Sequence, residues 1–292
     1  MKVLAIDGGG IRGLIPALVL AEVERRTGQG VASLFDLVAG TSTGAILACA
    51  LTRPDPMPAA RAAELYEQEG PQIFHRSLVK EVTSLGGLVD ERYDSSGLVA
   101  SLRRHLGDTR LAQATTRLFV TAYDLEARNA VLLTRDDDMT MVDAAHASSA
   151  APTYFEPVRV GGRTLVDGGV FATNPAMLAY AATGGRLDVL ASLGTGEHVR
   201  PLPFDTVKDW GRLEWAQPIL DVVFDGSADA VDRELSTLVD VRYVRLQTRL
   251  EEASDALDDV TPDNLAALRR EAERLIARRD ADIGRLCSLL AA

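Results

Sequence analysis

The sequence predicts an α/β fold, organised as a single domain in which a mostly parallel central sheet is flanked by helices. Short apolar runs alternate with segments of helical periodicity, and two of these runs end in glycine-rich turns that each open a helix. No internal repeat, low-complexity linker or change of composition divides the 292 residues. Apolar residues make up 47% of the chain, which is enough for a substantial core. One domain over residues 1–292 is therefore the simplest arrangement.

The charge balance excludes some classes of partner. The formal net charge is −11 and the isoelectric point about 4.9, so the protein as a whole repels phosphate backbones and anionic lipid surfaces. We therefore expect no nucleic-acid partner, and any membrane contact needs a local apolar or basic patch. The two cysteines, Cys49 and Cys287, lie in apolar helical contexts and form neither a disulfide framework nor a metal-ligand cluster. This pattern favours a reducing compartment and predicts no metal site.

The beginning of the chain bears on the compartment as well. Its first residues become polar too soon to be the apolar region of a signal peptide. No run approaches the roughly 18 apolar residues that a membrane-spanning helix needs. We therefore expect a cytoplasmic protein without a transmembrane segment, which associates with membranes only peripherally.

A glycine-rich loop follows the first predicted strand. Val3–Ile6 is a short apolar run ended by Asp7, and the next residues are Gly8-Gly9-Gly10-Ile11-Arg12-Gly13. A helix is expected from Leu14 to Arg26, because it has a proline in its first turn, apolar spacing, terminal arginines and a stop at Gly28. The glycines therefore lead into a helix N-terminus, where backbone amides can stabilise a negative oxygen such as an oxyanion.

The same loop also satisfies the G-x-G-x-x-G fingerprint of dinucleotide-binding proteins, so an oxidoreductase is an alternative. That fingerprint requires an acidic residue about 20 positions further on, at the end of the second strand, to hold a ribose hydroxyl. Here the second strand ends at Val38-Ala39 without a carboxylate. The missing acid argues against the dinucleotide alternative.

The second glycine turn presents a serine. Residues 35–39 are an apolar run that breaks at Gly40-Thr41-Ser42-Thr43-Gly44 and continues as a small-residue apolar helix over residues 44–51. In such a G-x-S-x-G elbow the glycines leave room for a strained backbone that lifts the serine hydroxyl out of the turn. The alternative is a tight turn in which Ser42 caps the next helix.

Further elements follow in alternation. Helical patterns cover residues 59–68, 98–106, 142–149 and 176–182, while strands are expected at 117–124, 130–134, 154–160, 164–166, 187–193 and 241–246. Residues 70–95 are the least patterned, and they form either a cap over the site or an ordinary surface excursion. Residues 200–292 are expected to be a mainly helical extension of the same domain, ending in a packing helix over 262–290.

A nucleophilic serine needs a base within hydrogen-bonding reach. Histidine is the usual base, and the chain has His75, His105, His146 and His198. The order Ser42, Asp167, His198 matches that of an α/β-hydrolase triad, but an elbow so near the start leaves no room for the strands that normally precede it.

Asp167 is the better candidate for the base. It leaves an apolar strand beside Gly168 and Gly169, as Ser42 leaves its own strand. Parallel neighbouring strands would bring both residues to the carboxyl edge of the sheet, where α/β folds have their sites. The alternative is a turn aspartate that caps its own loop.

Together these residues resemble the patatin-like phospholipases, a family of lipid acyl hydrolases. Residues 7–13 are similar to the family's oxyanion loop, residues 40–44 to its nucleophile elbow and residues 167–169 to its catalytic aspartate motif. Two lesser stretches agree, at residues 147–155 and 192–196. The five motifs keep the family's order and lie within residues 3–196, whereas no motif is found beyond residue 200.

The resemblance implies a three-layer α/β/α fold and a Ser–Asp dyad without histidine. Ser42 would be the nucleophile and Asp167 the general base, with oxyanion-hole amides from Gly8, Gly9 and Gly10. Arg12 would hold that loop or add positive potential. No cofactor is implied.

The function expected from this resemblance is hydrolysis of glycerolipid or phospholipid acyl esters at a membrane or micelle surface, through an acyl-enzyme. Water as acceptor makes the protein a lipase or phospholipase A, and another alcohol makes it an acyltransferase. The alternative within the family is an effector of bacterial anti-phage defence that a nucleotide signal activates, with a control surface in residues 200–292.

Overall fold

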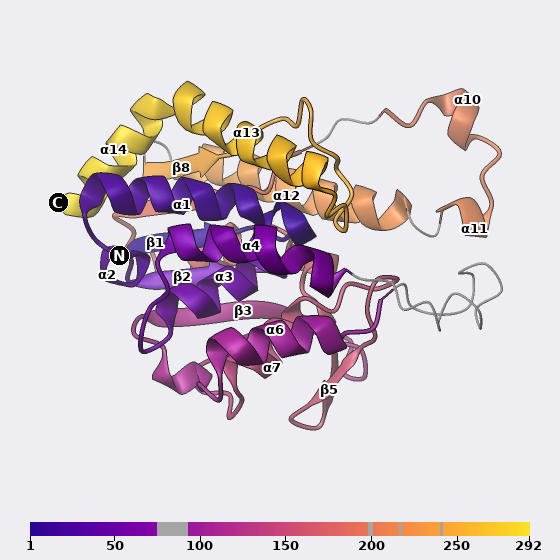
Figure 1. Ribbon diagram of the computed structural model, residues 1–292, viewed down its shortest axis with the longest axis horizontal. Helices are drawn as coiled ribbons and strands as arrows, with labels where there is room; N and C mark the ends of the chain where they lie inside the picture. Colours follow the sequence, from indigo (N-terminus) through magenta and orange to yellow (C-terminus); the bar gives the residue numbers. More distant parts are fainter. Residues whose placement is uncertain (75–92, 198–200, 216–217, 240–241) are drawn as a thin grey trace.

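The computed structural model describes residues 1–74, 93–197, 201–215, 218–239 and 242–292 (Figure 1). Most of the unpatterned stretch at 70–95 lies outside the described residues, and so does His75. His198 lies outside them as well.

The described residues form one mixed sheet whose central part is parallel. The strand order is β5-β6-β3-β2-β1-β7-β8, and β4 pairs with β3. All pairings from β3 to β8 through the centre are parallel, whereas β4, β5 and β6 join antiparallel at one side. The strands are β1 (Lys2–Ile6), β2 (Leu37–Gly40), β3 (Arg117–Asp124), β4 (Asn129–Thr134), β5 (Val158–Val160), β6 (Arg163–Asp167), β7 (Val189–Leu193) and β8 (Tyr243–Leu246).

Helices cover both faces of this sheet, which confirms the predicted α/β class with a mostly parallel sheet flanked by helices (Figure 1). The larger layer consists of α1 (Leu14–Thr27), α3 (Thr43–Thr52), α4 (Ala59–Ile73), α6 (Ser96–Leu106), α7 (Met141–Ser148), α13 (Pro262–Arg278) and α14 (Asp280–Ala291). The opposite layer contains α9 (Ala176–Ala182) and α12 (Pro218–Leu238). Short helices are η1 (Gly10–Gly13), α2 (Val31–Leu34), η2 (Leu111–Gln113), α8 (Gly169–Ala172), α10 (Phe204–Val207) and α11 (Arg212–Trp215).

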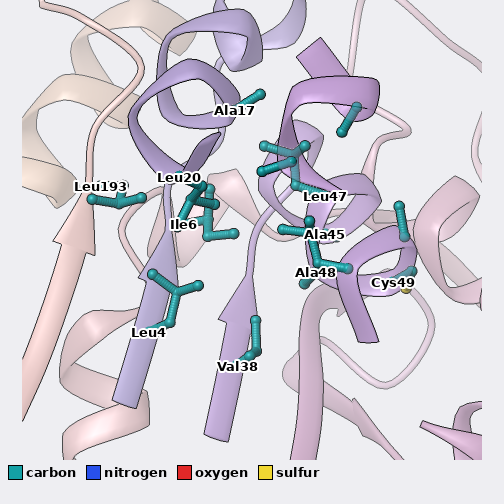
Figure 2. Close-up of a cluster of buried hydrophobic side chains, with 14 of the residues drawn as sticks. Leu4, Ile6, Ala17, Leu20, Val38, Ala45, Leu47, Ala48, Cys49 and Leu193 are labelled. Carbon is teal, nitrogen blue, oxygen red and sulfur yellow. The ribbon is translucent and has the colours of Figure 1, made fainter. Parts of the chain in front are cut away.

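The apolar first strand is buried on both faces because it lies at the centre of the sheet. Leu4 and Ile6 point into the larger layer, where they pack with side chains of α1 and α3 (Figure 2). Val3 and Ala5 alternate with them and enter the core of the opposite layer. All four side chains are completely buried. This strand therefore provides a rigid base for the glycine-rich loop that follows it.

The C-terminal part extends the same sheet and differs from prediction in one respect. β8 pairs in parallel with β7, and α13 packs on α1. The helix predicted over 262–290 is two helices, because the backbone of Arg279 leaves the helical region (φ −106°, ψ 24°). The Arg279 guanidinium binds the Asp282 carboxylate and the Arg245 carbonyl, which stabilises the break. Among the described residues, no helix is both long and apolar enough to cross a membrane.

Candidate active site

The turn after β2 is a strained elbow that exposes the serine. Ser42 has φ 55° and ψ −121°, values that non-glycine residues rarely adopt. A Cβ atom on Gly40 would lie 2.2 Å from the Gly44 carbonyl oxygen, and one on Gly44 would lie 2.2 Å from the Ile6 carbonyl oxygen. Only glycine therefore allows α3 to start so close to β1 and β2. Ser42 stands at the N-cap position of α3, but its side chain makes no capping hydrogen bond, so the capping alternative is wrong.

Ser42 and Asp167 line the same cavity, and the Ser42 side chain is near enough to Asp167 to help lower the pKa of that carboxyl. Asp167 ends β6 and is only 2% exposed. Its Oδ1 also accepts a 2.7 Å hydrogen bond from the Gly169 amide. Burial raises the pKa of Asp167 to about 7, although the Ser42 side chain and the hydrogen bond from Gly169 act in the opposite direction. The site therefore holds a carboxylate whose pKa lies close to neutral pH.

The strands that carry these two residues are not parallel neighbours, so that prediction was wrong. β3 separates β6 from β2, and β6 runs antiparallel to β3. β3 continues beyond β2: Gly40 pairs with Val120, whereas Asp167 pairs with Ala122. The carboxyl end of β6 consequently reaches the level of the turn that follows β2. Ser42 and Asp167 meet because β3 is long, not because their strands are parallel.

One of the two lesser motifs links both residues. The Ser148 hydroxyl accepts a 2.9 Å hydrogen bond from the Ser42 amide. The Ala150 carbonyl accepts a 3.0 Å hydrogen bond from the Asp167 amide. The segment at the end of α7 therefore fixes the backbone of the elbow relative to the backbone of Asp167, which preorganises the two side chains.

The glycine-rich loop passes beside Ser42, and its neighbours leave no room for side chains at Gly9 and Gly10. A Cβ atom on Gly9 would lie 2.2 Å from the Thr195 hydroxyl oxygen. Gly10 has φ +57°, and a Cβ atom there would lie 2.2 Å from the Leu257 carbonyl oxygen. The Gly8 amide donates to the Thr173 carbonyl at 3.0 Å, whereas the amides of Gly9 and Gly10 have no acceptor among the described residues. Gly168 is equally constrained, because its Cβ would lie 2.0 Å from the Thr121 hydroxyl oxygen.

Arg12 holds this loop in place. Its Nε donates to the Gly9 carbonyl at 3.3 Å and its Nη1 to the Gly196 carbonyl at 3.2 Å. Burial lowers the pKa of the Arg12 guanidinium, while the nearby carboxylates, led by Asp225, raise it. The second lesser motif contributes too, since the Thr195 hydroxyl donates to the Gly8 carbonyl at 2.8 Å.

The C-terminal third supplies anchors for the loop that were not predicted from the sequence. Arg245 on β8 makes two hydrogen bonds to Asp7, at 3.0 and 2.6 Å, directly before the glycine-rich loop. The Leu257 carbonyl accepts a 2.9 Å hydrogen bond from the Ile11 amide. The sequence did contain one indication of this pairing. Arg245 interrupts the apolar run that predicted β8, and a charge in a buried strand requires a partner.

Ser42 opens onto an apolar cavity of about 120 Å³. Ser42, Ile46 and Ala50 line it from one face of α3, because residues four apart share a helix face. Helices α4 and α6 and a nearby aromatic cluster complete the wall, with Ile73, Phe74, Leu98, Leu102, Leu106 and Phe155. The cavity therefore extends from the serine into the larger helical layer, and its lining suits an aliphatic chain.

Neither described histidine side chain hydrogen-bonds to Ser42 or Asp167. His105 lines the cavity wall, where its Nε2 lies 2.7 Å from Glu69 Oε1. His146 lies on α7 with its Nε2 buried and without a partner among the described residues. Within the described part of the chain, no group of three or more His, Cys, Asp or Glu side chains is arranged to hold a metal ion.

Comparison with known proteins identifies the family of this chain. Residues 4–180 match the patatin-like phospholipase family. Patatin-like protein 2 from Arabidopsis thaliana is 32% identical over 341 residues, a match that spans 95% of this chain and 83% of that protein. A potato (Solanum tuberosum) protein described as probable inactive patatin-3-Kuras 1 is 30% identical, over 95% of this chain and 87% of its own length. The chain belongs to the patatin-like phospholipase family.

Two solved structures are also similar in part. VipD from Legionella pneumophila superposes with a TM-score of 0.44 at 14% identity, over 95% of this chain and 67% of its own. The type III effector ExoU gives a TM-score of 0.41 at 12% identity, over 100% of this chain and 53% of its own.

Proposed function

We propose that this protein is a serine lipid acyl hydrolase that cleaves acyl esters of glycerolipids, with Ser42 as nucleophile and Asp167 as general base. The observation that carries the proposal is that Ser42, on its strained elbow, and Asp167, a buried carboxylate of pKa about 7, line the same apolar cavity. A serine hydroxyl requires such a base, and a base of near-neutral pKa is well suited to physiological pH.

In the acylation step the Ser42 oxygen attacks the ester carbonyl carbon while its proton passes to Asp167. The carbonyl oxygen becomes a negatively charged oxyanion in a tetrahedral intermediate. Collapse of this intermediate breaks the bond to the alcohol, and Asp167 returns the proton to the leaving oxygen. The products are an acyl-enzyme on Ser42 and a free alcohol, such as a lysolipid.

The oxyanion would bind the amides of Gly9 and Gly10, which have no acceptor among the described residues. The Gly8 amide is engaged by Thr173, so we assign Gly8 to the support of the loop and not to the hole itself. Arg12 acts as a positioning residue through its bonds to the carbonyls of Gly9 and Gly196. One such amide donor is typically worth about 3–4 kcal/mol of barrier.

Deacylation uses the same groups in reverse. Asp167 takes a proton from water while the water oxygen attacks the acyl carbonyl carbon. Collapse of the second tetrahedral intermediate breaks the bond to the Ser42 oxygen, which takes the proton back from Asp167. The released fatty acid leaves from the cavity beside α3. Another alcohol in place of water would give acyl transfer by the same steps.

The experiment that tests the proposal compares hydrolysis and covalent labelling in single variants. We expect Ser42→Ala and Asp167→Asn each to lose at least about a thousandfold in hydrolysis of a phospholipid, because the nucleophile and the base act as one unit. Ser42→Ala should also lose labelling by a fluorophosphonate probe. The control is Ser33→Ala, which removes an exposed hydroxyl on α2. Full activity in Asp167→Asn would overturn the dyad and return attention to His198.

A further inference from the structure

Exposed apolar side chains are concentrated in the segment that leads into α12. Five of the eight large apolar side chains that are exposed in the described part of the chain lie between residues 202 and 223. Phe204 is 77% exposed, which is the largest value among them. We call this set of side chains the apolar ridge, and it consists of Leu202, Phe204, Ile219, Val222 and Val223. A concentration of this kind marks an interaction site, whereas single exposed apolar residues do not.

Both tryptophans of the sequence lie between Phe204 and Ile219 along the chain. Trp210 and Trp215 stack edge to face, with ring centroids 5.1 Å apart and an interplanar angle of 82°. Both rings are half-buried. Tryptophan combines an apolar ring with a polar N–H, and it concentrates where hydrocarbon meets water.

The ridge adjoins the cavity of Ser42 through α12. Phe224 follows Val223 directly, and its ring lines the cavity, 3.2 Å from the position that a Cβ atom on Gly169 would take. The Ser227 hydroxyl, one turn later, donates to the Thr173 hydroxyl at 3.2 Å and joins α12 to the site. Figure 1 shows α10 and α11 projecting from the body at the end where α12 begins. One helix therefore presents an exposed apolar edge outward and an aromatic ring to the cavity.

We propose that the apolar ridge docks the protein on a lipid surface without net charge, such as a phosphatidylcholine bilayer, and so brings the cavity mouth to its substrate. The charge of the segment that carries the ridge favours an uncharged bilayer over an anionic one. Residues 202–225 carry five carboxylates and two basic side chains, so their net charge is −3. An anionic surface would repel this segment, whereas an uncharged one accepts its apolar side chains. The inference rests on the proposed function, since a lipid hydrolase must reach substrate in an aggregate.

The first test measures binding without catalysis, in a Ser42→Ala background. Phosphatidylcholine vesicles are added, and the emission of Trp210 and Trp215 reports docking directly, because the chain has no other tryptophan. We expect a blue shift and cosedimentation with these vesicles, and at least tenfold weaker binding to phosphatidylglycerol vesicles. Equal or stronger binding to phosphatidylglycerol would overturn the assignment of an uncharged surface.

The second test changes the ridge. We expect Phe204→Ser/Val222→Ser to weaken binding to phosphatidylcholine vesicles at least tenfold. The matched control is Leu238→Ser, which changes a 62% exposed leucine at the other end of α12, about 24 Å from Val222 along the helix axis. In the catalytically intact protein the double variant should lose at least tenfold of its activity on vesicles and keep its activity on a soluble butanoyl ester.

The outcomes separate the two proposals. Wild-type vesicle binding by the double variant would overturn docking and leave the assignment of Ser42 untouched. Soluble-ester hydrolysis that survives Ser42→Ala would overturn the proposed function, while the binding results would still stand. A dimer that light scattering detects in the wild type and not in the double variant would identify the ridge as an interface between copies, and would overturn lipid docking.

Discussion

The two sides of the glycine-rich loop differ in chemistry. Toward Ser42 the loop borders the apolar cavity of about 120 Å³. On its other side lies a polar cleft of about 290 Å³, whose lining includes Asp7, Arg12 and Arg245 together with the carboxylates of Glu197 and Asp225. Gly10 lines the apolar cavity and Gly9 lies between the two cavities, while the charges that hold the loop lie on the polar side.

The two sides of the loop therefore have different roles: the apolar side surrounds the amides, and the polar side holds the loop in position. Amides stabilise a developing charge best where water is excluded and the local dielectric is low. A loop rich in glycine cannot hold such amides by its own side chains, so its position must come from neighbours. The ion pair of Asp7 with Arg245 and the two bonds of Arg12 supply that position without exposing a charge to the cavity.

Among the changes that test the two sides of the loop, the largest effect is expected when the ion pair on the polar side is broken. Arg245→Met leaves Asp7 buried without its partner, and breaking a buried pair typically costs about 3–5 kcal/mol of stability. We also expect a loss of roughly a hundredfold in kcat, because the loop that follows Asp7 loses its anchor. Denaturant unfolding and ester hydrolysis measure the two effects.

The control for this change is Arg249→Met, which removes an exposed arginine four residues further on. A second variant, Asp7→Asn/Arg245→Met, should recover part of the stability because it removes the unpaired charge. Wild-type stability in Arg245→Met would contradict the anchoring role of the pair.

Burial on the apolar side makes the ionised form of Asp167 unfavourable, and this lowers the stability of the fold at neutral pH. Its pKa is about 7 in the folded protein and 3.8 without the surroundings of the fold, so between these values the folded state binds more protons than the unfolded state. Stability from this group therefore falls as pH rises through that window, and the loss is complete above pH 7. Asp167→Asn removes the titration, so its free energy of unfolding relative to the wild type should rise by about 2–4 kcal/mol from pH 4 to pH 8. A difference that stays constant with pH would argue against a buried, proton-binding Asp167.

The same pKa predicts the pH dependence of catalysis. Asp167 must be deprotonated to accept the Ser42 proton, so kcat/KM should fall about fiftyfold from pH 7 to pH 5 and approach a tenfold loss for each further pH unit. A soluble short-chain ester is the appropriate substrate, because it separates this titration from lipid binding. A profile that stays flat down to pH 5 would exclude a base of this pKa.

Local patterns predicted much of the site because each depends on a few adjacent residues. The elbow at Gly40–Gly44 and the glycine-rich loop are turns whose sterics exclude other side chains, so their sequence alone indicates their conformation. The apolar strands Val3–Ile6 and Val189–Leu193 are similarly local, since burial on both faces requires continuous apolar residues.

Long-range partners could not be predicted in the same way. Arg245 lies 238 residues from Asp7, and their pairing depends on the position of β8 in the sheet. The antiparallel direction of β6 depends on its pairing with the long strand β3, which no feature near Asp167 encodes. The break at Arg279 is stabilised by the distant Arg245 carbonyl. Tertiary contacts decide each of these features, and a single sequence does not reveal them.

The smallest predicted effect concerns the length of the acyl chain that the apolar side accepts. Ala50 lines the cavity two helical turns beyond Ser42, about 12 Å along α3. Ala50→Phe should fill this part of the cavity and lower kcat/KM for a hexadecanoyl ester about tenfold while leaving a butanoyl ester unchanged, since the short chain ends before it. Ala50→Val adds less volume and should lie between the wild type and Ala50→Phe. Parallel loss on both esters would mean that the acyl chain follows another path, because a blocked cavity affects only chains long enough to enter it.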